Sequence, residues 1–225
     1  MTFVVFGTPP SSVVDRLSMR TPRLERLTKK EEGVNRQIQV FGAPDGRSPR
    51  IISDDNHLIV VLGTPEFNQQ DIFEARTTAD AVTILKGKTA DIDSSFFVLL
   101  WEHDQVGLTM FSDRFGSKVI YYFLHPEFCL LSTELNFLCL IAPGLTDKNI
   151  DKEAIFEFLW FRRLFGQKTY LKDVKCIPPA AKSSLSRRGE LSISRYWIPR
   201  HDEEKVPPFE WAERIEMGIR NGVEN

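Results

Sequence analysis

The sequence predicts an α+β fold built mainly from antiparallel strands. Short runs rich in β-branched and aromatic residues recur along the chain, most clearly at 57–62 (HLIVVL) and 96–101 (FFVLLW). Stretches with apolar residues at helical spacing stand at 78–86, 134–141 and 152–163, the last behind a capping aspartate. Because several strands are joined by turns too short for a crossover helix, neighbouring strands must run antiparallel.

The N-terminal third is less regular, and its breaks predict its elements. The run FVVF at 3–6 predicts a strand, which Gly7 and two prolines end. A helix can follow Ser11 or Ser12 and must stop by Pro22. The segment 37–41 predicts a further strand before a turn-rich stretch.

Residues 96–131 give the strongest pattern, and we expect them to form one antiparallel meander of four strands. In this interpretation the loop SDRFGSK at 112–118 is a hairpin turn. Gly116 would supply a positive φ there, and Lys118 would pair with Asp113 across the turn.

The C-terminal part predicts a last hairpin and then a separate helix. Strands at 182–186 and 190–194 flank an RRG turn. A proline-rich, charged stretch typical of a linker follows, and then a helical pattern begins at 209. Trp211, Ile215 and Ile219 are each four residues apart and share one face of that helix.

Composition excludes several classes of function. The 225 residues carry a formal net charge of −2, so no strong field would attract nucleic acid or anionic lipid. The longest apolar run is far too short to span a membrane. The three cysteines lie in or beside apolar runs and the four histidines are scattered, which predicts reduced thiols, a cytoplasmic protein and no metal site.

Five segments, taken in order, resemble the N-terminal class II glutamine amidotransferase-type domain of the asparagine synthetase family. They are FFVLLWE at 96–102, DRFGSKVIYY at 113–122, LSTE at 131–134, IPPA at 177–180 and RYW at 195–197. The resemblance implies a four-layer α/β/β/α sandwich of the N-terminal-nucleophile hydrolase type, with two antiparallel sheets. It assigns residues 1–198 to that domain, and 199–225 to a linker and the first helix of a synthetase domain.

The same resemblance shows where the glutamine-splitting residues should stand. Family members begin Met-Cys, and the cysteine is the nucleophile; here Thr2 takes its place. The family forms its oxyanion hole with an Asn-Gly pair, which here is Leu62 and Gly63. Arg36 is displaced by one place from the arginine that binds the glutamine carboxylate, and in a strand this offset turns a side chain to the opposite face. Asp80 matches the aspartate that binds the glutamine amine.

These departures cluster on one ligand, so we expect a pseudo-amidotransferase domain with no catalytic residues of its own. The resemblance places ATP and Mg in a partner synthetase domain or protein, because the SGGxDS run of that domain is absent from this chain. The expected partner surface comprises two groups of residues, Asp113, Arg114 and Lys118, and Trp211, Ile215 and Ile219. The alternatives are a lactam- or lasso-peptide-forming system, a binding module, a fragment, and, for assembly, a homodimer.

Overall fold

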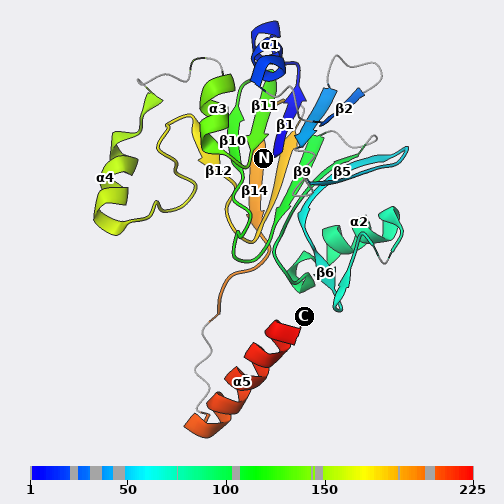
Figure 1. Ribbon diagram of the computed structural model, residues 1–225, viewed down its shortest axis with the longest axis vertical. Helices are drawn as coiled ribbons and strands as arrows, with labels where there is room; N and C mark the ends of the chain where they lie inside the picture. The colour runs from blue at the N-terminus through cyan, green and yellow to red at the C-terminus, as the bar shows by residue number, and fades with distance from the viewer. Residues whose placement is uncertain are drawn as a thin grey trace.

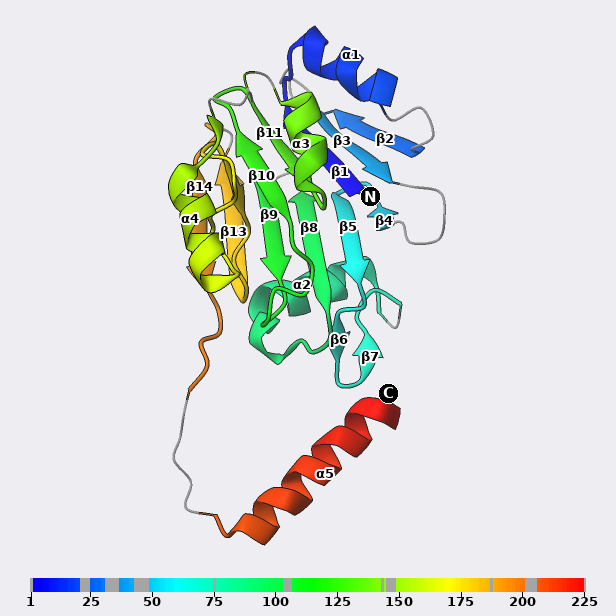
Figure 2. The same ribbon diagram turned by 60° about the vertical axis from the view of Figure 1, so that its left-hand side comes forward.

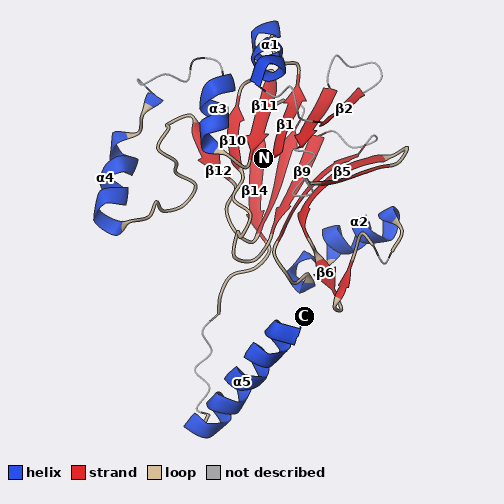
Figure 3. Cartoon of the chain, in the orientation of Figure 1, coloured by secondary structure: helices blue, strands red, loops and turns tan. Residues whose placement is uncertain are grey.

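Two six-stranded antiparallel sheets stack face to face, with helices on their outer sides (Figure 1; Figure 3). The structure is a computed structural model, and it describes residues 2–20, 25–30, 37–42, 49–74, 76–102, 107–142, 144, 149–186, 188–200 and 206–224. The first sheet has the order β12 (Val174–Cys176), β10 (Tyr121–Leu124), β11 (Phe128–Ser132), β1 (Thr2–Gly7), β3 (Gln37–Gly42) and β2 (Glu25–Lys30).

The second sheet has the order β14 (Leu191–Arg195), β13 (Ala181–Ser186), β9 (Gly107–Ser112), β8 (Phe96–Glu102), β5 (His57–Gly63) and β4 (Arg50–Ser53). A small hairpin of β6 (Glu66–Phe67) and β7 (Gln70–Asp71) lies beyond its end. The helices are α1 (Ser11–Arg20), α2 (Thr78–Gly87), the 3-10 turn η1 (Thr89–Asp91), α3 (Leu135–Ile141), α4 (Lys152–Phe161) and α5 (Pro208–Glu224).

Strand β8 shows why the layers form. Alternate side chains of a strand point to opposite faces, so Phe97, Leu99 and Trp101 enter the core between the two sheets. Phe96, Val98 and Leu100 face the other way, into the core under α2. Burial of each such side chain contributes roughly 1.5–3 kcal/mol, which explains why a strand apolar on both faces lies in the middle of a sheet.

The outer helices complete the four layers. Val13 and Leu17 of α1 and Leu138 of α3 pack on the outer face of the first sheet. Ala81 and Leu85 of α2 pack on the outer face of the second sheet. Figure 2 shows α2 beside this sheet. The α/β/β/α sandwich expected from the sequence is therefore confirmed.

The expected meander is wrong. Strands β8 and β9 lie in the second sheet, whereas β10 and β11 lie in the first. Residues 113–120, which we call the crossing loop, carry the chain from one sheet to the other instead of turning a hairpin. The reason is that β10 and β11 find their partners far away in sequence, at β12 and β1, and a local pattern does not contain that choice.

The edge strands of both sheets include elements that the sequence pattern did not predict. Strand β2 has the sequence ERLTKK, and charged residues on an edge strand discourage pairing with another molecule. Strands β4 and β12 are only four and three residues long. Such strands lack the apolar alternation that identifies a buried strand.

Helix α5 stands apart from the sandwich in both views (Figures 1 and 2). Trp211, Ile215 and Ile219 are all exposed on it. Among the described helices, none is long and apolar enough to cross a membrane.

Candidate functional site

The beginning of the chain lies inside the sandwich. Thr2 starts β1 in the middle of the first sheet and is only 6% exposed. Its backbone N–H donates to Thr133 Oγ1 at 3.1 Å, and the Thr133 N–H donates to the Thr2 carbonyl at 3.1 Å. Two hydrogen bonds to Thr133 therefore hold Thr2, which stands at the nucleophile position. Thr133 belongs to the LSTE segment, but the sequence did not predict this contact.

Thr2 lines a cavity between the two sheets, which we call the N-terminal cavity. Its lining comprises three hydroxyl residues and seven apolar ones: Thr2, Ser132, Thr133, Val4, Val60, Leu62, Phe97, Leu99, Ile120 and Leu131. The cavity has a volume of about 10 Å³, which is the space that a single water molecule needs. It is too small for a glutamine side chain.

Leu62 brings an aliphatic side chain into this cavity, where the family has an amide donor. Gly63 follows it with φ +81°, and a Cβ at this position would lie 1.9 Å from the carbonyl oxygen of Ser95. The close approach of the two strands therefore requires glycine here for steric reasons alone. The structure thus brings Thr2 and Leu62 together, and the Leu62 side chain itself offers no polar donor for an oxyanion.

Asp80 serves a different purpose from ligand binding. It lies in the first turn of α2, where its N–H donates to Thr77 Oγ1 at 3.2 Å and its carboxylate accepts from that hydroxyl at 2.7 Å. This is a reciprocal cap of the helix. Asp80 is exposed and is not part of the lining of the N-terminal cavity.

The arginine expected to bind a glutamine carboxylate, Arg36, lies outside the described residues. A different arginine, Arg50, lies near Gly63 and donates to its carbonyl at 3.3 Å. Its guanidinium also forms ion pairs with Asp71 at 2.6 Å and Glu74 at 2.9 Å. Arg50 therefore ties β4 to the β6–β7 hairpin, and both of its terminal nitrogens are engaged.

Asp113 organises the crossing loop from inside. It is 2% exposed, and its carboxylate accepts hydrogen bonds from the N–H groups of Phe96 (3.2 Å), Phe115 (2.9 Å) and Ser117 (3.1 Å). The Ser117 hydroxyl also donates to it at 3.2 Å. The expected pair with Lys118 is therefore not formed, because backbone donors occupy the carboxylate. Buried in this way, Asp113 does not face a partner.

The segments that resemble the family meet around this loop. Ala180 N–H donates to the Asp113 carbonyl at 2.8 Å, and Ser112 Oγ donates to the Pro178 carbonyl at 2.7 Å. The Tyr196 hydroxyl donates to the Ser112 carbonyl at 2.6 Å, and burial raises the pKa of this phenol. We call Ser112, Asp113, Pro178, Ala180 and Tyr196 the crossing cluster.

Gly116 has φ +65° as expected, and a Cβ there would lie 3.1 Å from Pro179. Arg114 donates to the Ala90 carbonyl and pairs with Asp93, both at 2.6 Å. Lys118 is exposed, and its Cε lies 3.3 Å from the position that a Gly63 Cβ would take. Gly116 and Arg114 thus stabilise the crossing loop and its contacts. Of these three residues, Lys118 is the one that is exposed, near the N-terminal cavity.

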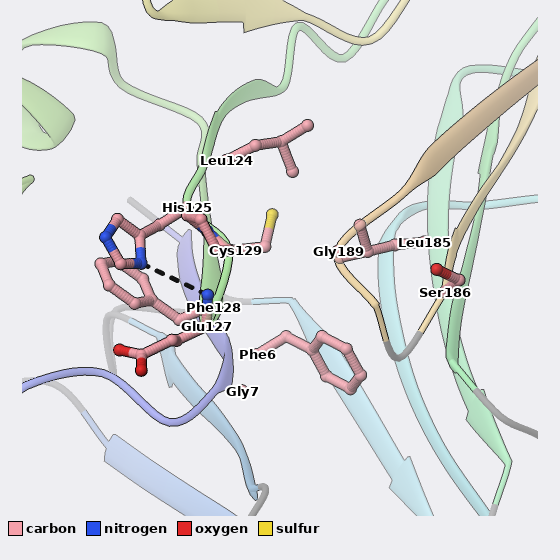
Figure 4. A pocket seen from close by; sticks show the side chains of 11 residues that line it. Phe6, Gly7, Leu124, His125, Glu127, Phe128, Cys129, Leu185, Ser186 and Gly189 are labelled. Carbon is pink, nitrogen blue, oxygen red and sulfur yellow. Dashed lines mark hydrogen bonds between the residues drawn. The ribbon is translucent and has the colours of Figure 1, made fainter.

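A second cavity of about 10 Å³ lies between the sheets near the β10–β11 turn (Figure 4). Cys129 is fully buried there, and burial raises the pKa of its thiol to about 12. The His125 ring stacks on Phe128 at 4.5 Å, and its Nδ1 accepts the Glu127 N–H at 3.3 Å. Figure 4 shows the imidazole turned away from the Cys129 sulfur, so the two do not form a nucleophile–base pair.

Among the described side chains, no group of three histidines, cysteines, aspartates or glutamates is placed to hold a metal ion. A groove of about 290 Å³ lies at one end of β8, β9, β13 and β14. Glu102, Glu190 and several serines contribute to its lining. Glu102 is already paired with Lys86 there.

Stacked antiparallel sheets between helical layers, with the chain start buried between them, define a four-layer sandwich of the N-terminal-nucleophile hydrolase type. The profile of the glutamine amidotransferase domain family matches residues 74–197, which is more than half of the chain. The protein belongs to this family.

A solved structure agrees with the fold. The chain is similar to a structure of the allosteric regulatory enzyme of purine biosynthesis, with a TM-score of 0.50 and 9% identity. It is also similar to glutamine phosphoribosylpyrophosphate amidotransferase from B. subtilis complexed with ADP and GMP, with a TM-score of 0.46 and 9% identity. Each match covers 88% of this chain and 49% of the other, so the chain spans about half the length of these proteins. No curated protein matches the sequence.

Proposed function

We propose that this chain is a degenerate glutamine amidotransferase domain that does not hydrolyse glutamine. The observation that carries the proposal is the N-terminal cavity, which is apolar apart from three hydroxyl groups and has room for about one water molecule. A glutaminase needs a pocket that holds the amino acid and a donor for the tetrahedral oxyanion. Loss of one such donor costs about a hundred- to a thousandfold in rate.

Thr2 alone does not rescue the chemistry. A threonine can act as an N-terminal nucleophile when its own α-amine serves as base. After removal of Met1, the Thr2 nitrogen would lie 3.1 Å from Thr133 Oγ1. The lining of the cavity nevertheless includes no histidine, carboxylate, amide or cationic side chain that could orient a substrate.

The proposed setting is an asparagine-synthetase-like system in which a synthetase-type domain or protein activates a carboxylate with ATP and Mg. The five segments that resemble that family support this setting, as does the exposed apolar face of α5. An isolated helix of this length is marginal in water, so its apolar stripe favours a partner surface. Lys118 and the exposed Phe115 of the crossing loop would form the second part of that surface.

Lactam- or lasso-peptide-forming synthesis is the closest alternative, because such systems form amides without glutamine hydrolysis. A binding module is the second alternative. The N-terminal cavity does not favour it, but the groove of about 290 Å³ does, since this volume approaches that of ordinary ligand sites.

The test is ammonia release from the purified protein with millimolar glutamine. We expect no release above background, and the same result for Thr2→Ala. Thr2→Cys should also stay inactive, because Leu62 still offers no donor to the oxyanion. Ammonia release that Thr2→Ala abolishes, or an acyl-enzyme trapped by Thr2→Cys and seen by mass spectrometry, would contradict the proposal.

A further inference from the structure

Helix α4 exposes large apolar side chains that its own domain does not cover. Phe156, Leu159 and Trp160 are 63%, 58% and 81% exposed, while Ala154 is the fully buried residue of the helix. Figure 1 shows α4 projecting at the side of the sandwich. A helix that is apolar on both sides is normally buried on both sides.

The exposed residues form one continuous face. Phe156 lies three and four residues before Leu159 and Trp160, and residues at this spacing are neighbours on a helix surface. Ala154 lies on the opposite side, where it packs against the domain. The face therefore has an apolar centre that points away from the sandwich.

Charges of opposite sign stand at the two ends of this face. Glu153 precedes Phe156 in the first turn of α4, and Arg162 and Arg163 follow the last residue of the helix. All three are exposed. Lys152 is exposed beside Glu153, and Asp151 caps the helix, so the N-terminal end has a net negative charge of one and the C-terminal end a net positive charge of two.

We infer that this face binds the same face of a second copy of the chain, with the two α4 helices antiparallel about a two-fold axis. An isologous contact requires a surface that is complementary to itself. With the axis beside Phe158, Glu153 of each copy lies opposite Arg163 of the other. Phe156 then lies opposite Trp160 of the other copy, and the two helix dipoles are antiparallel.

The size of the face suits a weak contact. Taking about 200 Å² for a fully exposed aromatic side chain, Phe156, Leu159 and Trp160 together offer on the order of 400 Å² per copy. Two copies would bury about 800 Å², which is in the range of weak, transient interfaces. A weak, concentration-dependent dimer is therefore expected.

Existing contacts of α4 are compatible with this pairing. Glu157 is paired with Lys168 at 2.6 Å on the side facing the domain. The Arg163 guanidinium lies over the Phe165 ring at 4.5 Å. Both contacts leave Phe156, Leu159 and Trp160 exposed.

The first experiment measures the mass of the full chain by sedimentation equilibrium from micromolar to near-millimolar concentration. The wild type should form a dimer, and Trp160→Glu should weaken it about thirtyfold or more, as loss of a central aromatic does in other interfaces. Phe115→Glu, at an equally exposed aromatic on the crossing loop, is the matched control and should leave the dimer unchanged. Circular dichroism should show all variants folded.

A charge exchange tests the orientation. Glu153→Arg and Arg163→Glu should each weaken the dimer about three- to tenfold, and the double variant should regain wild-type affinity because opposite charges again face each other. A monomeric wild type at all concentrations would overturn the inference. So would equal effects of Trp160→Glu and Phe115→Glu, or a dimer lost on deletion of α5, which would assign the contact to that helix.

Discussion

The crossing cluster and the N-terminal cavity lie in the same sandwich but differ in polarity and in hydrogen bonding. Around Asp113, backbone and side-chain donors satisfy a buried carboxylate, and three segments distant in sequence are joined by hydrogen bonds. Around Thr2 and Leu62, aliphatic side chains enclose a space the size of a water molecule. The segments that resemble the family meet at the first region, and the expected departures from it fall at the second.

The largest effect should come from the crossing cluster. Asp113→Ala leaves the buried Phe96 N–H and the part-buried N–H groups of Phe115 and Ser117 without an acceptor, and we expect a loss of about 3–5 kcal/mol in the free energy of unfolding. Urea denaturation measures it. Asp93→Ala is the control, because it removes only an exposed partner of Arg114 and should cost about 0.5 kcal/mol or less. Equal losses in the two variants would mean that the cluster does not hold the fold.

Alkaline pH should destabilise the protein through the core between the sheets. The pKa of Cys129 rises from 9.0 to about 12 on burial, so the unfolded chain loses this proton before the folded one does. The contribution of the protonated Cys129 thiol to the free energy of unfolding is fully present below pH 9. It falls by up to about 1.4 kcal/mol per pH unit between pH 9 and 12. Tyr122, whose pKa burial raises to about 12, adds to the loss above pH 10.

Urea midpoints measured from pH 8 to 11 test this dependence. Cys129→Ala lowers stability overall but should give a shallower slope above pH 9. An identical slope would assign the alkaline loss to other groups.

A smaller effect is expected at the cavity. Leu62→Asn places a polar amide among apolar side chains, at a cost of about 1–3 kcal/mol. This is less than the cost at Asp113, and glutamine should not restore stability, because the cavity holds no more than about one water. Thermal unfolding with and without millimolar glutamine measures both. A rise of the melting temperature with glutamine would show that glutamine still binds in the N-terminal cavity.

The smallest effect on stability should follow deletion of residues 209–225. Helix α5 stands apart from the sandwich, so the melting temperature should change little, while co-purification with a synthetase-type protein should be lost. A fall of many degrees would show that α5 belongs to the core of this domain.

Local patterns predicted most elements but not their assignment to sheets. The buried strand at 96–101, the cap of Asp151 and the positive φ of Gly116 all follow from neighbouring residues, and the structure confirms them. The loop SDRFGSK forms hydrogen bonds with Phe96, Ala90 and Ala180, so its course depends on partners far away in sequence. The size of the N-terminal cavity was equally beyond prediction, because it depends on how ten side chains from both sheets pack. The sequence predicted that Leu62 replaces a donor, whereas the size of the space beside it follows only from the packing.

The pairing of β1 with β11 also has a consequence for the order in which the chain can fold. Strand β1 pairs with β3, which is near in sequence, and with β11, which is not. Phe3 can therefore pair with Ser132 only after β11 has been synthesised. On the ribosome, the first sheet therefore cannot close until more than half of the chain has emerged. Contacts between distant segments slow folding, and an unpaired strand edge is a site for aggregation. During this interval, a chaperone acting on the nascent chain would bind the edge of β1 that is not yet paired with β11.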